Sequence, residues 1–164
     1  NTVKQDDPEL SVRYIQTTRQ PFRVILDNRL EIATNAKVLQ KPGSLIFTTL
    51  QDNQKIDSLS EKGARVVVLS SSTGKLDLAE VMSTLAELEI NEVLVEAGST
   101  LSSAFVESRL VDEIIIYFAP IVLGNYAQSM LNLPELTSLS QKWQLEIKEI
   151  GKVGSDIKIT AKLI

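Results

Sequence analysis

The segment from Val95 to Leu101 reads Val-Glu-Ala-Gly-Ser-Thr-Leu and combines an apolar run, a small-residue turn and an expected helix start. Gly98 would let a ligand approach the backbone closely. The amides of Ser99, Thr100 and Leu101 would be free donors, and a helix start favours an anion such as a phosphate or pyrophosphate. An ordinary turn with Ser99 as N-cap fits the same letters, because one glycine is far weaker than a Gly-x-Gly-x-x-Gly fingerprint.

Two more polar groups are expected at the carboxyl ends of strands, where open α/β sheets bind their ligands. Glu96 ends one apolar run, and Asp27, Asn28 and Arg29 follow another. Arg29 could meet a 2′-phosphate, and Asn28 could bind a ribose or phosphate oxygen. A solvated glutamate and a simple turn are the plain alternatives, so these residues gain weight only beside the glycine turn.

Acidic and basic residues also gather near the N-terminus. Asp6-Asp7-Pro8 fits a turn or a helix start. Adjacent carboxylates suggest magnesium as well, but no further ligands stand at a suitable spacing, so no metal site is predicted. Arg13 could hold a phosphate through its planar guanidinium, or be an ordinary surface arginine.

The composition excludes several kinds of chemistry. The 164 residues include no cysteine and no histidine, which excludes disulfides, thiol nucleophiles, Ser-His-Asp triads and the usual zinc sites. The net charge of −4 does not suggest a nucleic-acid surface, and no stretch of about 18 apolar residues predicts a membrane span. We therefore expect neither nucleic acid nor membrane as a partner, and the cytoplasm is the default location.

Apolar periodicity predicts the elements that must position these groups. Near-continuous apolar runs, typical of parallel strands covered on both faces, are 22–26, 44–50, 65–69, 92–96 and 112–119. Helical periodicity begins at Asp77, with Glu80 three residues later as in a capping box, and a second helix is expected from Ser99 to about Arg109. This alternation predicts an α/β sheet with right-handed parallel crossovers.

The C-terminal residues follow a different pattern. Residues 143–150 and 156–163 alternate polar and apolar side chains around a glycine-containing turn, which predicts an antiparallel hairpin at the edge of the sheet. Residues 124–142 show no strong period. Without a repeat or a linker, residues 1–164 are expected to form one domain.

Three blocks of this sequence resemble the reductase domain of the bifunctional deaminase/reductase of riboflavin biosynthesis. They are Thr2-Val3 with Asp6 to Arg13, then residues 23–30, and then 95–101 with 110–113, Ala119-Pro120 and Leu123-Gly124. The resemblance implies a dihydrofolate-reductase-like α/β fold, with a mixed, mostly parallel sheet flanked by helices and an antiparallel C-terminal hairpin. It further implies that NADPH reduces the ribosyl group of 5-amino-6-(5-phosphoribosylamino)uracil to ribityl, by hydride transfer to C1′.

The resemblance also assigns residues. Thr2 and Asp6 would lie beside the nicotinamide, with Asp6 as the candidate proton donor, and Asn28 would touch the adenosine side. Leu10, Arg13 and Glu96 would bind the phosphorylated pyrimidine substrate, Arg13 near its phosphate. The pyrophosphate would be bound by the residues that run from the glycine into the helix, namely Gly98, Ser99, Thr100, Leu101, Ser102, Ser103 and Ala104.

Departures from the family pattern limit these assignments. Asn28 replaces the usual serine, and Ala97 replaces the commoner glycine before Gly98. The resemblance implies a preceding strand and a zinc deaminase domain of the same polypeptide, and it implies a homodimer. We therefore expect a fragment of a larger protein with a reductase fold. Whether this fragment is active by itself is a separate question.

Two alternatives stay open. A stand-alone reductase of the same fold could act on another pterin or pyrimidine, since one fold hosts several substrates. A nucleotide-binding fragment without catalysis is the other, and it would bind NADPH without turnover.

Overall fold

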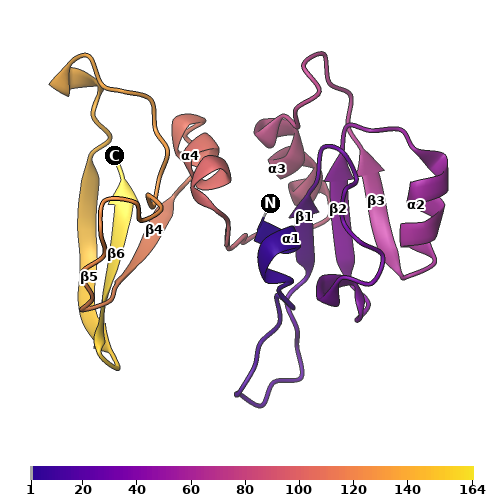
Figure 1. Ribbon diagram of the computed structural model, residues 1–164, viewed down its shortest axis with the longest axis horizontal. Helices are drawn as coiled ribbons and strands as arrows, with labels where there is room; N and C mark the ends of the chain where they lie inside the picture. The colour runs from indigo at the N-terminus through magenta and orange to yellow at the C-terminus, as the bar shows by residue number, and fades with distance from the viewer. Residues whose placement is uncertain (1) are drawn as a thin grey trace. The chain divides into compact units, whose positions relative to one another are not determined.

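The computed structural model describes residues 2–164, which divide into two compact units: unit 1 ends at Val93, and unit 2 is Leu94–Ile164. Unit 1 contains a parallel three-stranded sheet in the order β1-β2-β3 (Figure 1). Its strands and helices are α1 (Thr2–Asp6), β1 (Arg23–Leu26), β2 (Ser44–Thr48), α2 (Asn53–Ser60), β3 (Ala64–Val68) and α3 (Leu78–Glu87), with a 3-10 turn, η1 (Lys37–Leu39). The three strands predicted here are confirmed.

The central strand β2 is buried on both faces. Leu45, Ile46 and Phe47 are each fully buried. Because successive side chains of a strand point to opposite faces, Ile46 joins one hydrophobic cluster, and Leu45 and Phe47 join another. This two-sided burial explains why the sequence shows a continuous apolar run here rather than an alternating one.

The predicted helix after Asp77 is also confirmed. The Asp77 carboxylate accepts a hydrogen bond from the Ala79 amide at 2.8 Å and so caps α3. Val81 and Leu85 carry the apolar stripe into the core beside β2. Helix α2 was not expected, because its sequence Asn-Gln-Lys-Ile-Asp-Ser-Leu-Ser is mostly polar and fully buries one residue, Leu59.

Unit 2 contains an antiparallel three-stranded sheet in the order β4-β6-β5. Its elements are α4 (Ser99–Glu107), β4 (Glu113–Phe118), the 3-10 turn η2 (Leu139–Gln141), β5 (Leu145–Val153) and β6 (Asp156–Leu163). The predicted hairpin is confirmed, although β5 runs further than expected, and the hairpin pairs with β4 in a separate sheet rather than at the edge of the parallel sheet. Val153 pairs with Asp156, which leaves Gly154 in the tight turn at φ 63°.

Two predictions about the sheet are wrong. Residues 92–96 form no strand in the described part of the chain, and Leu94 is 73% exposed. The strand predicted at 112–119 exists as β4, but it pairs antiparallel with β6 rather than parallel through a crossover. The mixed α/β class is correct, and the single domain stays a prediction.

No helix in residues 2–164 has both the length and the apolar character to cross a membrane.

The end of α3 generates a stability prediction. Glu89 takes a left-handed conformation with φ 60°, and the Ile90 amide bonds to the Leu85 carbonyl at 3.1 Å, as in a Schellman cap. Glycine adopts this conformation without the Cβ penalty, so Glu89→Gly should raise the free energy of unfolding by about 0.5–1 kcal/mol. Urea denaturation measures this change.

The matched control is Ala86→Gly within α3, which should lower stability by about 1 kcal/mol. A loss of stability in both variants would contradict the proposed cap.

Candidate functional site

The glycine turn leads directly into α4, as the sequence predicted. Gly98 is the N-cap residue, with φ −72° and ψ 168°, and no side chain caps the helix. The alternative with Ser99 as N-cap is therefore wrong by one residue. Because this extended backbone is open to any residue, the turn does not require glycine for its conformation. What glycine contributes at this position is the absence of a side chain.

The first turn of α4 offers three backbone donors. The first helical bond joins the Ser102 amide to the Gly98 carbonyl at 3.1 Å. The amides of Ser99, Thr100 and Leu101 donate no hydrogen bond to any described residue. Three free amides at the positive end of a nine-residue helix suit a phosphate group chemically.

The later residues of the predicted pyrophosphate seat are engaged within unit 2. Ser103 is buried, and its hydroxyl accepts a hydrogen bond from the Asn132 amide at 2.6 Å. Ser102 Oγ donates to the Ala97 carbonyl at 3.4 Å, across the glycine turn. Ala104 is partly buried in the helix. Among the described residues, the donors of this seat without a partner are therefore the first-turn amides and the hydroxyls of Ser99 and Thr100.

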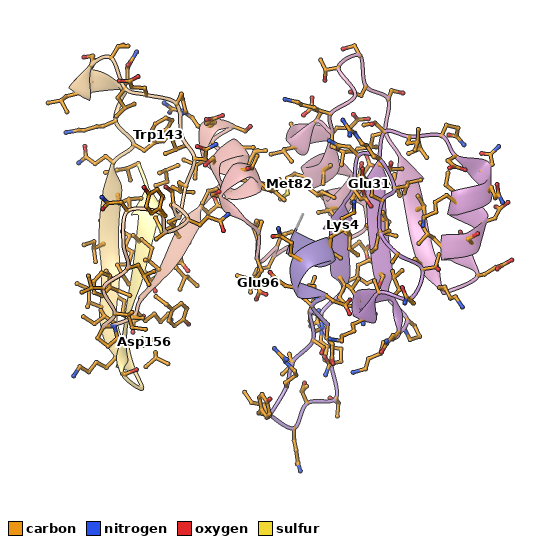
Figure 2. The ribbon with its side chains drawn as sticks, viewed as in Figure 1. Lys4, Glu31, Met82, Glu96, Trp143 and Asp156 are labelled. Atoms are coloured by element: carbon orange, nitrogen blue, oxygen red, sulfur yellow. The ribbon has the colours of Figure 1, made fainter. Side chains whose placement is uncertain are left out.

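Glu96 lies in the extended segment before this turn, and its side chain is exposed (Figure 2). The prediction that it stands at the end of a strand is wrong, because residues 92–96 form none. It still precedes Gly98 by two residues, in the segment that leads into α4.

Asn28 belongs to a polar cluster at the carboxyl ends of the parallel strands, which we call the strand-end cluster: Asn28, Thr48, Thr49, Gly74 and Leu76. The Asn28 carbonyl accepts from Thr48 Oγ1 at 3.1 Å and from Thr49 Oγ1 at 3.2 Å. Its side-chain Oδ1 accepts from the Leu76 amide at 3.1 Å. Asn28 thus joins the end of β1 to the end of β2 and to the loop before α3.

The sequence analysis missed the two threonines of this cluster. They directly follow, or end, an apolar strand, and the rule that placed Asn28 at a carboxyl-end edge applies to them equally. Thr48 is fully buried and also accepts from the Leu50 amide at 3.1 Å, so it is a structural member. Thr49 is half-buried and lies 3.3 Å from the Gly74 carbonyl.

The N-terminal site residues lie on α1 and the loop after it. Asp6 ends the helix and is exposed, whereas Leu10 is partly buried against the core of unit 1. Arg13 is exposed. The backbone of Thr2 begins α1, but its side chain lies outside what the structure describes. Asp6, Leu10 and Arg13 therefore lie on one short segment, at the end of α1 and in the loop that follows it.

Ion pairs tie this segment to the stretch after β1. Lys4 donates a hydrogen bond to Glu31 (Figure 2), Lys37 Nζ lies 3.7 Å from Asp7 Oδ2, and Lys41 pairs with Glu9 at 4.0 Å. In the described residues, acidic side chains form no group of three that could hold a metal ion. Of the two adjacent carboxylates, that of Asp7 forms the ion pair with Lys37, and that of Asp6 is exposed.

Residues 1–159 match the protein family described as the RibD C-terminal domain. The chain belongs to this family.

Several relatives in the RibD family are similar over nearly the whole chain. The riboflavin biosynthesis protein RibD of Escherichia coli (strain K12) is 34% identical over 168 residues, which cover 95% of this chain and 45% of that protein. The 5-amino-6-(5-phosphoribosylamino)uracil reductase of Buchnera aphidicola subsp. Acyrthosiphon pisum is 29% identical over 171 residues, which cover 97% of this chain and 81% of that protein.

A solved structure of RibD from Acinetobacter baumannii matches with a TM-score of 0.86 at 30% identity, over 99% of this chain and 45% of that chain. This match confirms the dihydrofolate-reductase-like fold class. The chain spans less than half the length of the RibD proteins it matches.

The Lys4–Glu31 pair in this RibD-family chain predicts a pH dependence of stability. The hydrogen bond from Lys4 and its positive charge lower the pKa of Glu31. A carboxyl whose pKa is lower in the folded state stabilises the fold above its unfolded pKa of about 4.3, and this contribution is lost as the pH falls through the folded pKa. Glu31→Gln should therefore flatten the decline of unfolding free energy between about pH 5 and pH 3.

Urea denaturation across this pH range measures the difference. The control is Glu87→Gln, which changes an exposed α3 carboxyl without an ion pair among the described residues and should follow the wild type. Parallel curves for wild type and Glu31→Gln would show that the pair adds nothing to folding.

Proposed function

We propose that this chain is an NADPH-dependent reductase that converts the ribosyl group of 5-amino-6-(5-phosphoribosylamino)uracil to ribityl. The observation that carries the proposal is the free amide trio of Ser99, Thr100 and Leu101 behind Gly98. Membership in the RibD C-terminal domain family and the name of the Buchnera reductase support the reaction and the substrate. A reductase of riboflavin biosynthesis implies a nicotinamide cofactor, and NADPH is the form we propose.

The residues of this chain fit such a cofactor by the chemistry of their donors. The first-turn amides of α4 would hold the pyrophosphate, since they are unpaired and stand at the positive end of the helix dipole. Thr2 and Asp6 would lie beside the nicotinamide, and Asn28 with Thr49 of the strand-end cluster would border the adenosine. When bound, a reduced nicotinamide supplies the hydride.

The protein's own task is to bind and orient the substrate. Arg13 is exposed and presents a guanidinium suited to the substrate phosphate, while Leu10 offers an apolar surface. Glu96 would hold the ribose or the pyrimidine. A proton must reach the sugar oxygen released at C1′ when the ring opens, and we assign its donation to the Asp6 carboxyl. Because the cofactor would supply the hydride and the protein would position it, no covalent nucleophile is required.

Three properties of the whole protein belong to the same proposal. The RibD relatives are more than twice as long as this chain. We propose that the chain acts in a bifunctional polypeptide beside a deaminase domain, as a homodimer, and in the cytoplasm. Mass measurement of the native protein tests the first two properties.

Substitution of Gly98 tests the cofactor seat. Gly98→Asp introduces bulk and negative charge beside the free amides, so NADPH binding should weaken by about 2 kcal/mol or more, roughly 30-fold. Fluorescence titration with NADPH measures the Kd. Turnover is followed by loss of NADPH absorbance with the phosphoribosylamino uracil and, separately, with dihydrofolate.

The matched control is Gly151→Asp in β5, where an added Cβ meets nothing within 4 Å. It should bind NADPH like the wild type. Equal affinity in Gly98→Asp would remove the α4 turn from the cofactor site. Binding of NADPH without turnover would reduce the proposal to a nucleotide-binding function, and turnover of dihydrofolate alone would replace the substrate.

A further inference from the structure

The loop after α1 has an unusual backbone. Asp7 and Leu10 both adopt left-handed conformations, with φ 41° and φ 47°, although neither is glycine. Such conformations cost of order 1 kcal/mol or more each and persist where surrounding contacts hold them. The two positions lie on either side of Pro8-Glu9, between Asp6 and Arg13. The backbone path that links the proposed proton donor to the proposed phosphate ligand is therefore held under strain.

The Asp7 carboxylate provides the contact that holds this path. Its Oδ1 accepts a hydrogen bond from the Lys37 amide at 2.9 Å, and its Oδ2 lies 3.7 Å from Lys37 Nζ. Lys37 is the first residue of η1, and the N-cap residue Ala36 offers no side-chain hydrogen bond. Asp7 therefore caps η1 from a distant part of the chain.

The anchor point is part of the core. Val38 is fully buried and Leu39 nearly so, both in the cluster beneath β1 and β2. Val3 and Leu10, on either side of Asp7, pack against the same cluster. The buried turn η1 thus holds the loop at Asp7, and Val3 and Leu10 hold it before and after Asp7 in the sequence.

The neighbouring ion pairs are different in kind. All three ion pairs, Asp7–Lys37 included, join side chains that are each at least 43% exposed, but Lys4–Glu31 and Lys41–Glu9 are contacts between side chains alone. A pair between two exposed side chains contributes at most about 1 kcal/mol and does not fix the backbone, whereas a carboxylate bonded to a backbone amide forms a charge-assisted hydrogen bond that does. Asp7 is the acidic residue of this segment that bonds to backbone.

We infer that Asp7 is a positioning residue for the reductase reaction. It touches no reacting atom; through the Lys37 amide it sets the backbone from which Asp6, Leu10 and Arg13 project. This inference rests on the proposed function, because it assigns a role in placing the substrate segment. A displacement of about 1 Å in such a segment lowers turnover up to 100-fold.

Two variants at Lys37 separate the backbone bond from the ion pair. Lys37→Pro removes the amide donor at the first position of a helix, where proline fits, and Ala36 at φ −57° and ψ 140° already has the conformation favoured before proline. Lys37→Met keeps the amide and removes the charge. We expect kcat/KM for the uracil substrate to fall about 10- to 100-fold in Lys37→Pro and less than about threefold in Lys37→Met.

Variants at Asp7 test the acceptor. Asp7→Ala should match Lys37→Pro, and Asp7→Asn, whose amide oxygen can accept from Lys37, should recover most of the activity. Glu9→Gln is the control and should resemble the wild type. In the impaired variants the substrate KM should rise by a larger factor than the Kd for NADPH, because Leu10 and Arg13 both belong to the displaced segment, whereas the α4 amides proposed for the pyrophosphate remain.

Circular dichroism and thermal melting of the intact protein check that each variant is folded. The role of Asp7 is overturned if kcat/KM for the uracil substrate is the same in Lys37→Pro as in Lys37→Met, or the same in Asp7→Ala as in Glu9→Gln. The proposed function stands in that case, because the enzyme is still active. If Asp7→Ala does not fold, the comparison of the two Lys37 variants decides. A wild-type protein that does not reduce the uracil substrate overturns the proposed function, and the positioning role falls with it.

Discussion

Unit 1 depends on the burial of β2 from both sides. Leu45 and Phe47 belong to one cluster and Ile46 to the other, so a shift of one residue in register would exchange the two faces completely. The register of β1 and β3 on either side of β2 follows from this constraint. Because the three strands are parallel and in register, their carboxyl ends meet at one edge, and there Asn28 and the threonines form the strand-end cluster.

The local part of this structure could be predicted from the sequence. The buried strands, the cap at Asp77 and the C-terminal hairpin each follow from the period or type of neighbouring residues. The glycine turn before α4 was predicted in the same way, with an error of one residue in the cap. These features are encoded within about ten residues of chain, which is the range over which periodicity and capping act.

The remaining features depend on contacts between distant residues. Residues 92–96 have the composition of a strand, but they pair with no strand among the described residues, and strand formation requires a partner. The mostly polar sequence of α2 does not show that Leu59 within it packs into the core of unit 1. The contact of Asp7 with Lys37 spans 30 positions, and in the sequence Asp7 looked like a turn residue or half of a metal site. Residue types suggested the chemistry, but not the partner.

The backbone of Gly98 has a consequence for how this position tolerates substitution. Its φ of −72° and ψ of 168° are open to any residue, and at the N-cap of a helix serine, asparagine or aspartate is more stable than glycine by about a few tenths of a kcal/mol, because the side chain accepts a hydrogen bond from a first-turn amide. Folding alone would therefore prefer a side chain that caps the helix at this position. In a library of variants selected for thermal stability, residues with a side chain should be enriched at position 98. In a library selected for nucleotide binding, glycine should be kept. Stability and nucleotide binding would therefore favour different residues at this position.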